Sequence, residues 1–244
     1  MAHRGGAGYR PNRGNENTLA AFANAVELGY RYIETDVRAS ADGEAFCFHD
    51  GDLSRTVGDE RAFADLTAHQ VRQFRLRGGE SIPTLAEALE AFPQTRFNLD
   101  IKTDDALAPT TAVLDQAHAY HRVLVGSFSH ARLRRLRRAR PQIATSTSPS
   151  ETRALWLGLG PPARQGARAG ALCLQVPLRY RGRQVPNPRV IRAARRQNLQ
   201  VHVWTIDDAD TMNRLFDMGV DGIITDRPEV LRDVLRQRGQ WPAA

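Results

Sequence analysis

A chain of 244 residues can form one large α/β domain or two small ones, and a hydrophobic content of 41% is enough for a core. There is no apolar run of about 18 residues and no apolar signal-peptide core in MAHRGGAGYR, which argues against a membrane-spanning helix and a secretory leader and favours a cytoplasmic protein. The net charge of +7 admits an anionic partner, but every basic residue except Lys102 is arginine, which indicates a coding bias.

The two cysteines, Cys47 and Cys173, each lie inside an apolar run. Their context predicts buried free thiols, and a disulfide is not expected in a protein of the cytoplasm. The sequence contains no CxxC motif and no zinc-ligand spacing.

Strand-like and helical patterns alternate along the chain. Apolar periodicity and capping residues predict helices at 18–28, 67–75, 84–91, 105–120, 129–139, 150–157, 188–197, 208–218 and 228–236. Short apolar or alternating runs predict strands at 1–3, 30–37, 45–49, 96–102, 123–127, 142–147, 171–176, 199–206 and 222–225. Residues 51–82 look irregular, which predicts an insertion, and residues 158–170 read as a Gly/Pro/Arg loop. Thr84 and Glu87 have the spacing of a capping box.

These patterns form eight strand–helix units when residues 1–3 are counted as the first strand. That number and the chain length predict a (β/α)8 TIM barrel, with residues 1–244 as a single domain. In this architecture the active residues lie at the carboxyl ends of the strands.

Polar and aromatic residues do occur at those ends. They are His3 and Arg4, Glu34 and Asp36, Asp100 and Lys102, Ser127 and Phe128, Trp204, and Thr225 and Asp226. Core packing does not readily explain such a set.

The stretch from Ile33 to Asp50 carries the clearest chemistry. Side chains two apart in a strand point to the same face, so Glu34 and Asp36 aim two carboxylates at one point. Such a pair suits Mg²⁺ or Ca²⁺, and His49 ends the next short strand. Taken alone, the stretch is equally consistent with an edge hairpin that carries solvated charges.

Lys102 is the only lysine in the chain. Lysine is a compact point charge and arginine a planar fork, so its retention suggests a position where arginine fails. The run from Arg132 to Arg140 is read as a solvated helix face rather than a nucleic-acid patch, because no nucleic-acid-binding motif accompanies it. No nucleic-acid partner is expected.

Together the motifs resemble the glycerophosphodiester phosphodiesterase family of the phospholipase C-like phosphodiesterase superfamily. The matching segments span almost the whole chain in the family's order: His3-Arg4-Gly5, Glu16-Asn17-Thr18, Glu34-Thr35-Asp36, His49-Asp50, residues 82–85, residues 98–102, Ser127-Phe128, residues 203–205 and residues 219–228.

The resemblance implies a TIM barrel with a small insertion after strand 2, and cleavage of a phosphodiester such as glycerophosphocholine to sn-glycerol 3-phosphate and an alcohol. It implies that a divalent metal, Mg²⁺ or Ca²⁺, binds the three acids, and that two histidines form the acid/base pair. Residue by residue, the implied roles are metal ligands for Glu34, Asp36 and Asp100, acid/base catalysis for His3 and His49, phosphate binding for Arg4 and Lys102, and pocket walls for Phe128 and Trp204.

Supporting roles are weighed for two further acids. Asp50 could orient His49 or only shape a turn, and Glu16 could reach the metal site or only precede a helix that Asn17 and Thr18 cap.

The chain departs from the family at Asp100, where a glutamate is usual. This leaves room for a lysophospholipase D- or sphingomyelinase D-like activity on lipids. A third hypothesis is an arginine-rich nucleic-acid-binding barrel without catalysis, which predicts salt-sensitive DNA binding and no loss of function in His49→Ala.

Overall fold

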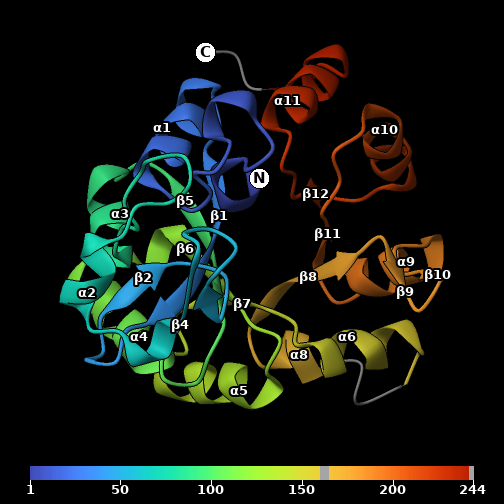
Figure 1. The fold of residues 1–244 in the computed structure, drawn as a ribbon. Helices are drawn as coiled ribbons and strands as arrows, with labels where there is room; N and C mark the ends of the chain where they lie inside the picture. Colours follow the sequence, from blue (N-terminus) through green and yellow to red (C-terminus); the bar gives the residue numbers. More distant parts are fainter. Residues whose placement is uncertain (160–164, 242–244) are drawn as a thin grey trace. The chain divides into compact units, whose positions relative to one another are not determined.

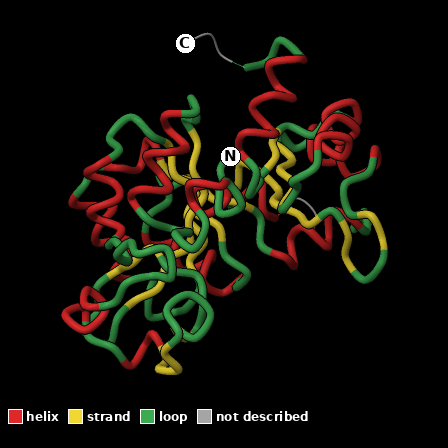
Figure 2. Tube along the Cα trace, turned by 45° about the horizontal axis from the view of Figure 1, so that its top comes forward, coloured by secondary structure: helices red, strands yellow, loops and turns green. Residues whose placement is uncertain are grey.

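The computed structural model describes residues 1–159 and 165–241 (Figure 1). The chain divides into two compact units, residues 2–123 and residues 124–244 together with Met1. Both units contain helices as well as strands (Figure 2). The single domain stays a prediction.

The first unit is built on a sheet of order β5-β1-β2. Strand β1 pairs in parallel with β5 and antiparallel with β2. The elements of this unit are η1 (His3–Gly5), η2 (Arg10–Asn12), α1 (Leu19–Glu27), β1 (Tyr32–Ala39), β2 (Ala45–Cys47), β3 (Asp52–Leu53), β4 (Asp59–Ala62), η3 (Phe63–Asp65), α2 (Ala68–Gln73), α3 (Leu85–Ala91), β5 (Arg96–Ile101), α4 (Leu107–Gln116) and η4 (Ala119–Arg122).

The strand predicted at residues 1–3 is shorter than expected, because only Ala2 forms a bridge and His3 already belongs to η1. Ala2 makes one parallel bridge to Ile33, and the chain then enters the short helix η1. Arg4 has a φ of 51° and Gly5 a φ of 81°, so the backbone turns by left-handed residues that a strand cannot contain.

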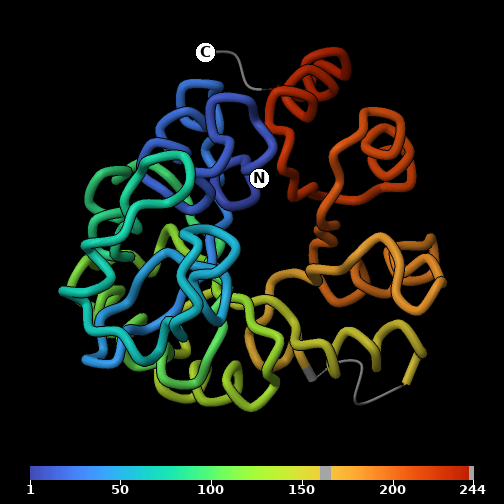
Figure 3. Tube along the Cα trace, viewed as in Figure 1, coloured from blue at the N-terminus to red at the C-terminus, as the bar shows by residue number. Residues whose placement is uncertain are grey.

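Residues 51–82 form an excursion of the chain between β2 and α3 (Figure 3). They contain β3 and β4, which pair antiparallel, then η3 and α2. Their apolar side chains form a buried cluster with the β2 region, comprising Phe46, Phe48, Leu53, Phe63, Leu66, Val71, Leu76 and Ile82. This excursion is therefore anchored to the β2 region by a shared core, and its status as an insertion in the family stays a prediction.

The second unit contains parallel strands in the order β6-β7-β8-β11-β12. Its elements are β6 (Val123–Gly126), α5 (His130–Ala139), β7 (Ala144–Ser146), α6 (Pro149–Trp156), α8 (Gln165–Arg168), β8 (Ala171–Pro177), β9 (Arg179–Tyr180), β10 (Arg183–Gln184), α9 (Pro188–Arg195), β11 (Gln200–Trp204), α10 (Ala209–Met218), β12 (Gly222–Ile223) and α11 (Pro228–Gln237). The N-terminal ammonium of Met1 donates to the Ile223 carbonyl at 2.6 Å.

Two expectations in this unit need correction. The loop predicted at 158–170 contains α8, although residues 160–164 lie outside the described part of the chain. The arginine run is not wholly solvated, because Arg132 and Arg137 are buried on the inner side of α5. Arg137 is held there by Glu151, whose Oε1 lies 2.8 Å from Nη1.

Both cysteines are buried free thiols, as predicted. Burial raises the pKa of each to about 12, so neither is a ready nucleophile. Within the described residues no helix combines the length and apolar character needed to cross a membrane.

Candidate active site

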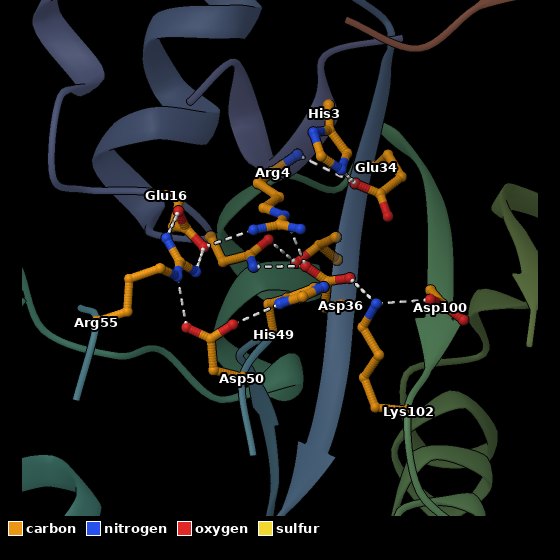
Figure 4. Close-up of polar contacts among 12 residues, drawn as sticks. His3, Arg4, Glu16, Glu34, Asp36, His49, Asp50, Arg55, Asp100 and Lys102 are labelled. Carbon is orange, nitrogen blue, oxygen red and sulfur yellow. Dashed lines mark hydrogen bonds and ion pairs between the residues drawn. The ribbon is translucent and has the colours of Figure 1, made fainter. Parts of the chain in front are cut away.

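Three carboxylates come together through the pairing of β1 with β5. Glu34 and Asp36 are two apart on β1, and the parallel register sets Asp36 opposite Asp100. All three side chains therefore share one face of the sheet (Figure 4). Lys102 follows the end of β5, and its backbone N–H donates to the Val37 carbonyl, which continues the ladder by one step.

Asp36 is almost fully buried and is surrounded by donors. Its Oδ1 lies 2.7 Å from Nζ of Lys102, and its Oδ2 lies 3.2 Å from Nε of Arg4 and 2.9 Å from Nδ2 of Asn17. Burial alone would raise the pKa of Asp36, but Lys102 first and Arg4 second outweigh it and lower that pKa below its ordinary value. This carboxylate is charged at neutral pH.

The pKa of Glu34 is shifted in the opposite direction. Burial, together with the neighbouring charge of Asp36, raises the pKa of Glu34 to about 7. Its Oε2 accepts a hydrogen bond from the Arg4 backbone N–H at 3.1 Å and lies 3.8 Å from Nε2 of His3. A nearby cation would return such a carboxyl to its charged form.

The three acids have the donor chemistry of a site for a hard divalent cation. Oδ2 of Asp100 accepts from Lys102 at 2.7 Å, but its Oδ1 is buried without a hydrogen-bond partner among the described residues. An orphaned carboxylate oxygen beside a carboxyl with a raised pKa fits the donor set of an oxygen-bound divalent cation. The described residues contain no ready-made group of three or more metal-binding side chains, so the donors fit in kind but are not preassembled.

A second group of charges joins Arg4 to His49. Nη1 of Arg4 donates to Oε1 of Glu16 at 2.9 Å, and both terminal nitrogens of Arg55 donate to Glu16 at 2.7 and 2.6 Å. Nε of Arg55 donates to Oδ2 of Asp50 at 2.7 Å, and Oδ1 of Asp50 lies 2.6 Å from Nδ1 of His49. Figure 4 shows this row of alternating charges beside the carboxylates of β1 and β5.

The turn around η1 is what brings Arg4 to this place. A Cβ on Gly5 would lie 2.8 Å from Cβ of Ala21, and φ is +81° there, so only glycine fits against α1. The Arg4 carbonyl accepts a hydrogen bond from the Asn17 backbone at 2.9 Å. The His3-Arg4-Gly5 motif is therefore a tight turn that directs one cation towards the β1 acids.

Phe128 and Trp204 belong to the second unit and contact each other. Their rings meet edge to face with centroids 5.9 Å apart, and Phe128 is 65% exposed. An exposed aromatic pair of this kind is suited to cover an apolar ligand surface, and its role as a pocket wall stays a prediction.

Two residues of this cluster, Asn17 and Arg55, are not predicted from the sequence to belong to the site. Asn17 looks like a helix cap in the sequence, but Thr18 is the N-cap of α1 while Asn17, at a φ of 59°, bonds Asp36 and accepts from Thr35. Arg55 is one arginine among many in an irregular segment. An Asn beside a natural capping residue is a usable signal; for Arg55 the sequence alone offers none.

Comparison with known proteins relates the chain to one family. The model of the glycerophosphoryl diester phosphodiesterase family matches residues 3–230. A Mycobacterium tuberculosis protein named probable glycerophosphodiester phosphodiesterase 2 is 43% identical over 100% of this chain and 93% of its own length. The glycerophosphodiester phosphodiesterase of Caldanaerobacter subterraneus subsp. tengcongensis is 30% identical over 98% of each chain.

Solved structures show the same fold. A phosphodiesterase from Oleispira antarctica in complex with the product sn-glycerol-3-phosphate superimposes with a TM-score of 0.81 at 24% identity, over 96% of this chain and 95% of that one. A glycerophosphodiester phosphodiesterase from Agrobacterium tumefaciens gives 0.78 at 25% identity, over 96% and 97% of the two chains. The predicted TIM-barrel class is confirmed.

Proposed function

Because the chain belongs to the glycerophosphoryl diester phosphodiesterase family and is a phosphodiesterase of that kind, we propose that it hydrolyses glycerophosphodiesters to sn-glycerol 3-phosphate and an alcohol by histidine acid/base catalysis with a divalent cation. The observation that carries the proposal is the convergence of His3, Arg4, Glu34, Asp36 and His49 in one cluster.

His49 suits the role of general base. The pKa of Asp50 lies below its ordinary value because donors from Arg55 and His49 outweigh burial, so Asp50 is ionised and can only accept. The hydrogen on the His49 ring must then sit on Nδ1, which leaves the lone pair on Nε2. Burial lowers the pKa of His49, which keeps the imidazole neutral near pH 7.

In the reaction, Nε2 of His49 takes the proton of the attacking hydroxyl, which is that of water or the glycerol 2-hydroxyl of the substrate. Attack by the 2-hydroxyl gives a cyclic phosphate that water then opens to sn-glycerol 3-phosphate. A new P–O bond forms and the bond to the leaving alcohol breaks. His3 is the candidate acid that gives a proton to the departing alkoxide. Arg4 and Lys102 lie beside the same acids and supply positive charge for the phosphate oxygens.

Glu34, Asp36 and Asp100 are the residues that would hold the divalent cation. When bound, the cation supplies Lewis-acid polarisation of a phosphoryl oxygen. Of the donors, Asp100 contributes the oxygen without a partner and Glu34 the carboxyl with the raised pKa. The chemistry of these oxygens suits Mg²⁺ or Ca²⁺.

The direct test is release of sn-glycerol 3-phosphate from a panel of glycerophosphodiesters, with and without exhaustive EDTA treatment. We expect activity that chelation abolishes and added Mg²⁺ or Ca²⁺ restores, and a loss of at least about 100-fold in His49→Ala. Full activity after chelation would refute the metal role. An active His49→Ala variant would refute the base.

A second candidate substrate is a lysophospholipid. Proteins named lysophospholipase D GDPD1 from human and rat are each 25% identical to this chain over 96% of its length, and Asp100 departs from the family's usual glutamate. Including lysophosphatidylcholine beside glycerophosphocholine in the panel separates the two. A higher kcat/KM for the lysolipid would favour this second candidate.

A further inference from the structure

Arg55 donates hydrogen bonds to two acids, Glu16 and Asp50, and each of these acids also contacts a proposed active-site residue. Its three side-chain nitrogens donate to one oxygen of Asp50 and to both oxygens of Glu16, at 2.6 to 2.7 Å. We propose that Arg55 is a positioning residue that orients Arg4 through Glu16 and His49 through Asp50. The inference rests on the proposed function, since it assigns Arg4 and His49 their roles.

Glu16 and Asp50 each have a second partner, which belongs to the proposed active site. Glu16 accepts from Nη1 of Arg4 at 2.9 Å, and Asp50 meets Nδ1 of His49 at 2.6 Å. Arg55 is therefore the common point of two short chains, one ending at a phosphate-binding cation and the other at the general base. A shift of its guanidinium moves both acids.

The largely buried negative charges of Glu16 and Asp50 require a cationic partner. The side chains of Glu16 and Asp50 are only 15% and 19% exposed, so each would be poorly solvated as a lone anion. Hydrogen bonds from Arg55 act against burial and lower the pKa of both acids. Asp50 then stays a pure acceptor, and this fixes the tautomer of His49.

The backbone holds Arg55 in place. Leu53 before it and Thr56 after it are buried, the Val57 N–H donates to the Leu53 carbonyl at 2.8 Å, and the Arg77 N–H donates to the Thr56 carbonyl at 2.8 Å. Arg55 is thus delivered by a turn that the hydrophobic cluster of the excursion anchors. This gives residues 51–82 a function in the site.

If Arg55 served only to stabilise the fold, its replacement would have little effect on catalysis. The Arg55 side chain is 51% exposed, and exposed ion pairs contribute little to folding stability. Its geometry also depends on the planar guanidinium, whose three separate nitrogens reach three oxygens on two acids, whereas a lysine ammonium donates from a single nitrogen and cannot span the same three positions. We therefore expect Arg55→Lys to fail in catalysis although it keeps the charge and the fold.

The first experiment compares kcat and KM for glycerophosphocholine in wild type, Arg55→Lys and Arg55→Met. Arg61 is the matched control, since it lies in the same excursion, is 53% exposed and pairs with the surface acid Asp59 at 2.7 Å. We expect both Arg55 variants to lose about 10- to 100-fold in kcat, the usual effect of removing a supporting partner, with a smaller rise in KM. The same exchanges at Arg61 should leave both constants unchanged.

A double-mutant cycle tests the route. If Arg55 acts on His49 through Asp50, the loss of kcat caused by Arg55→Met should be smaller in an Asp50→Asn background than in the wild-type background, and the remaining loss is the part exerted on Arg4 through Glu16. Independent, multiplying losses in kcat would contradict this route.

The tautomer of His49 gives a readout that does not depend on turnover. Imidazole ¹⁵N shifts should show a single Nδ1–H form in the wild type and a mixture in Arg55→Met. Arg55 variants with wild-type kinetics and one unchanged tautomer would overturn the inference. If the wild type releases no glycerol 3-phosphate but the His49 tautomer still differs between the wild type and Arg55→Met, the proposed function alone would be refuted.

Discussion

Lys102 lies between two acids of the site. Its Nζ is 2.7 Å from Oδ1 of Asp36 and 2.7 Å from Oδ2 of Asp100, and its side chain is 14% exposed. A compact ammonium can meet both carboxylates at once in this space, whereas a guanidinium has a larger planar head. The structure thus gives a steric reason for the single lysine in a chain with 34 basic residues.

We predict that Lys102→Arg lowers kcat by at least about tenfold, because the wider head displaces Asp36 or Asp100 from its place on the site face. Steady-state kinetics on glycerophosphocholine measure the effect, and a thermal melt checks that the fold is kept. A fully active, folded Lys102→Arg variant would refute the steric argument.

The period of a strand explains which site residues can be predicted from the sequence. Glu34 and Asp36 must share a face because they are two apart, and the same holds for Asp100 and Lys102. Arg55 is different. It reaches Glu16, 39 positions away, through a turn that no local periodicity encodes. Only the fold of residues 51–82 brings it there.

At the scale of elements, two short helices begin with the same motif in different surroundings. Thr84 caps α3 and Thr67 caps α2, each in a complete capping box with the residue three positions later. Thr84 is 1% exposed, while Thr67 lies at the surface. The pair therefore separates the effect of a cap from the effect of its burial.

We predict that Thr84→Ala lowers the free energy of unfolding by about 2 kcal/mol and Thr67→Ala by about 1 kcal/mol or less. In the exposed cap, water can replace the lost acceptor for the backbone N–H, but in the buried cap the N–H of Glu87 loses its partner. Urea unfolding of both variants measures the difference. Equal losses would show that burial of the cap does not matter.

The capping box of α3 could be predicted because it depends on four consecutive residues, and it is confirmed. Elements that depend on contacts with distant parts of the chain could not be predicted in this way. Residues 3–5 form η1, in which Gly5 packs against Ala21, so the strand expected at residues 1–3 is reduced to the bridge at Ala2. The segment before α9 contains the β9–β10 hairpin, although its sequence shows no clear alternation.

At the scale of the whole molecule, the arginine excess is not one continuous charged surface. Arg137 is 9% exposed and donates to Glu151, Thr145 and the Ser146 carbonyl, and Arg132 is 8% exposed and donates to Ser127. These guanidinium groups serve as buried donors that tie α5 to its neighbours. Net charge alone is therefore weak support for the nucleic-acid-binding hypothesis.

The stability of the molecule should also depend on pH through a histidine outside the site. His202 on β11 is buried. Its Nε2 lies 3.1 Å from Oε1 of Gln200, and its Nδ1 has no partner among the residues that the structure describes. Burial, with a smaller effect of the N-terminal ammonium, lowers the pKa of His202 from 6.5 to about 4. The folded protein therefore holds this imidazole neutral.

Between pH 6.5 and 4 the unfolded chain binds a proton at His202 that the folded chain does not. Its contribution to stability is present above pH 6.5 and is lost as the pH falls towards 4, by about 3 kcal/mol, because each pKa unit corresponds to about 1.4 kcal/mol. We predict that His202→Gln flattens the fall in unfolding free energy over this range, while the same exchange at the exposed His69 leaves the slope unchanged. Urea unfolding at a series of pH values measures both slopes, and an unchanged slope in His202→Gln would show that this histidine does not titrate as its burial requires.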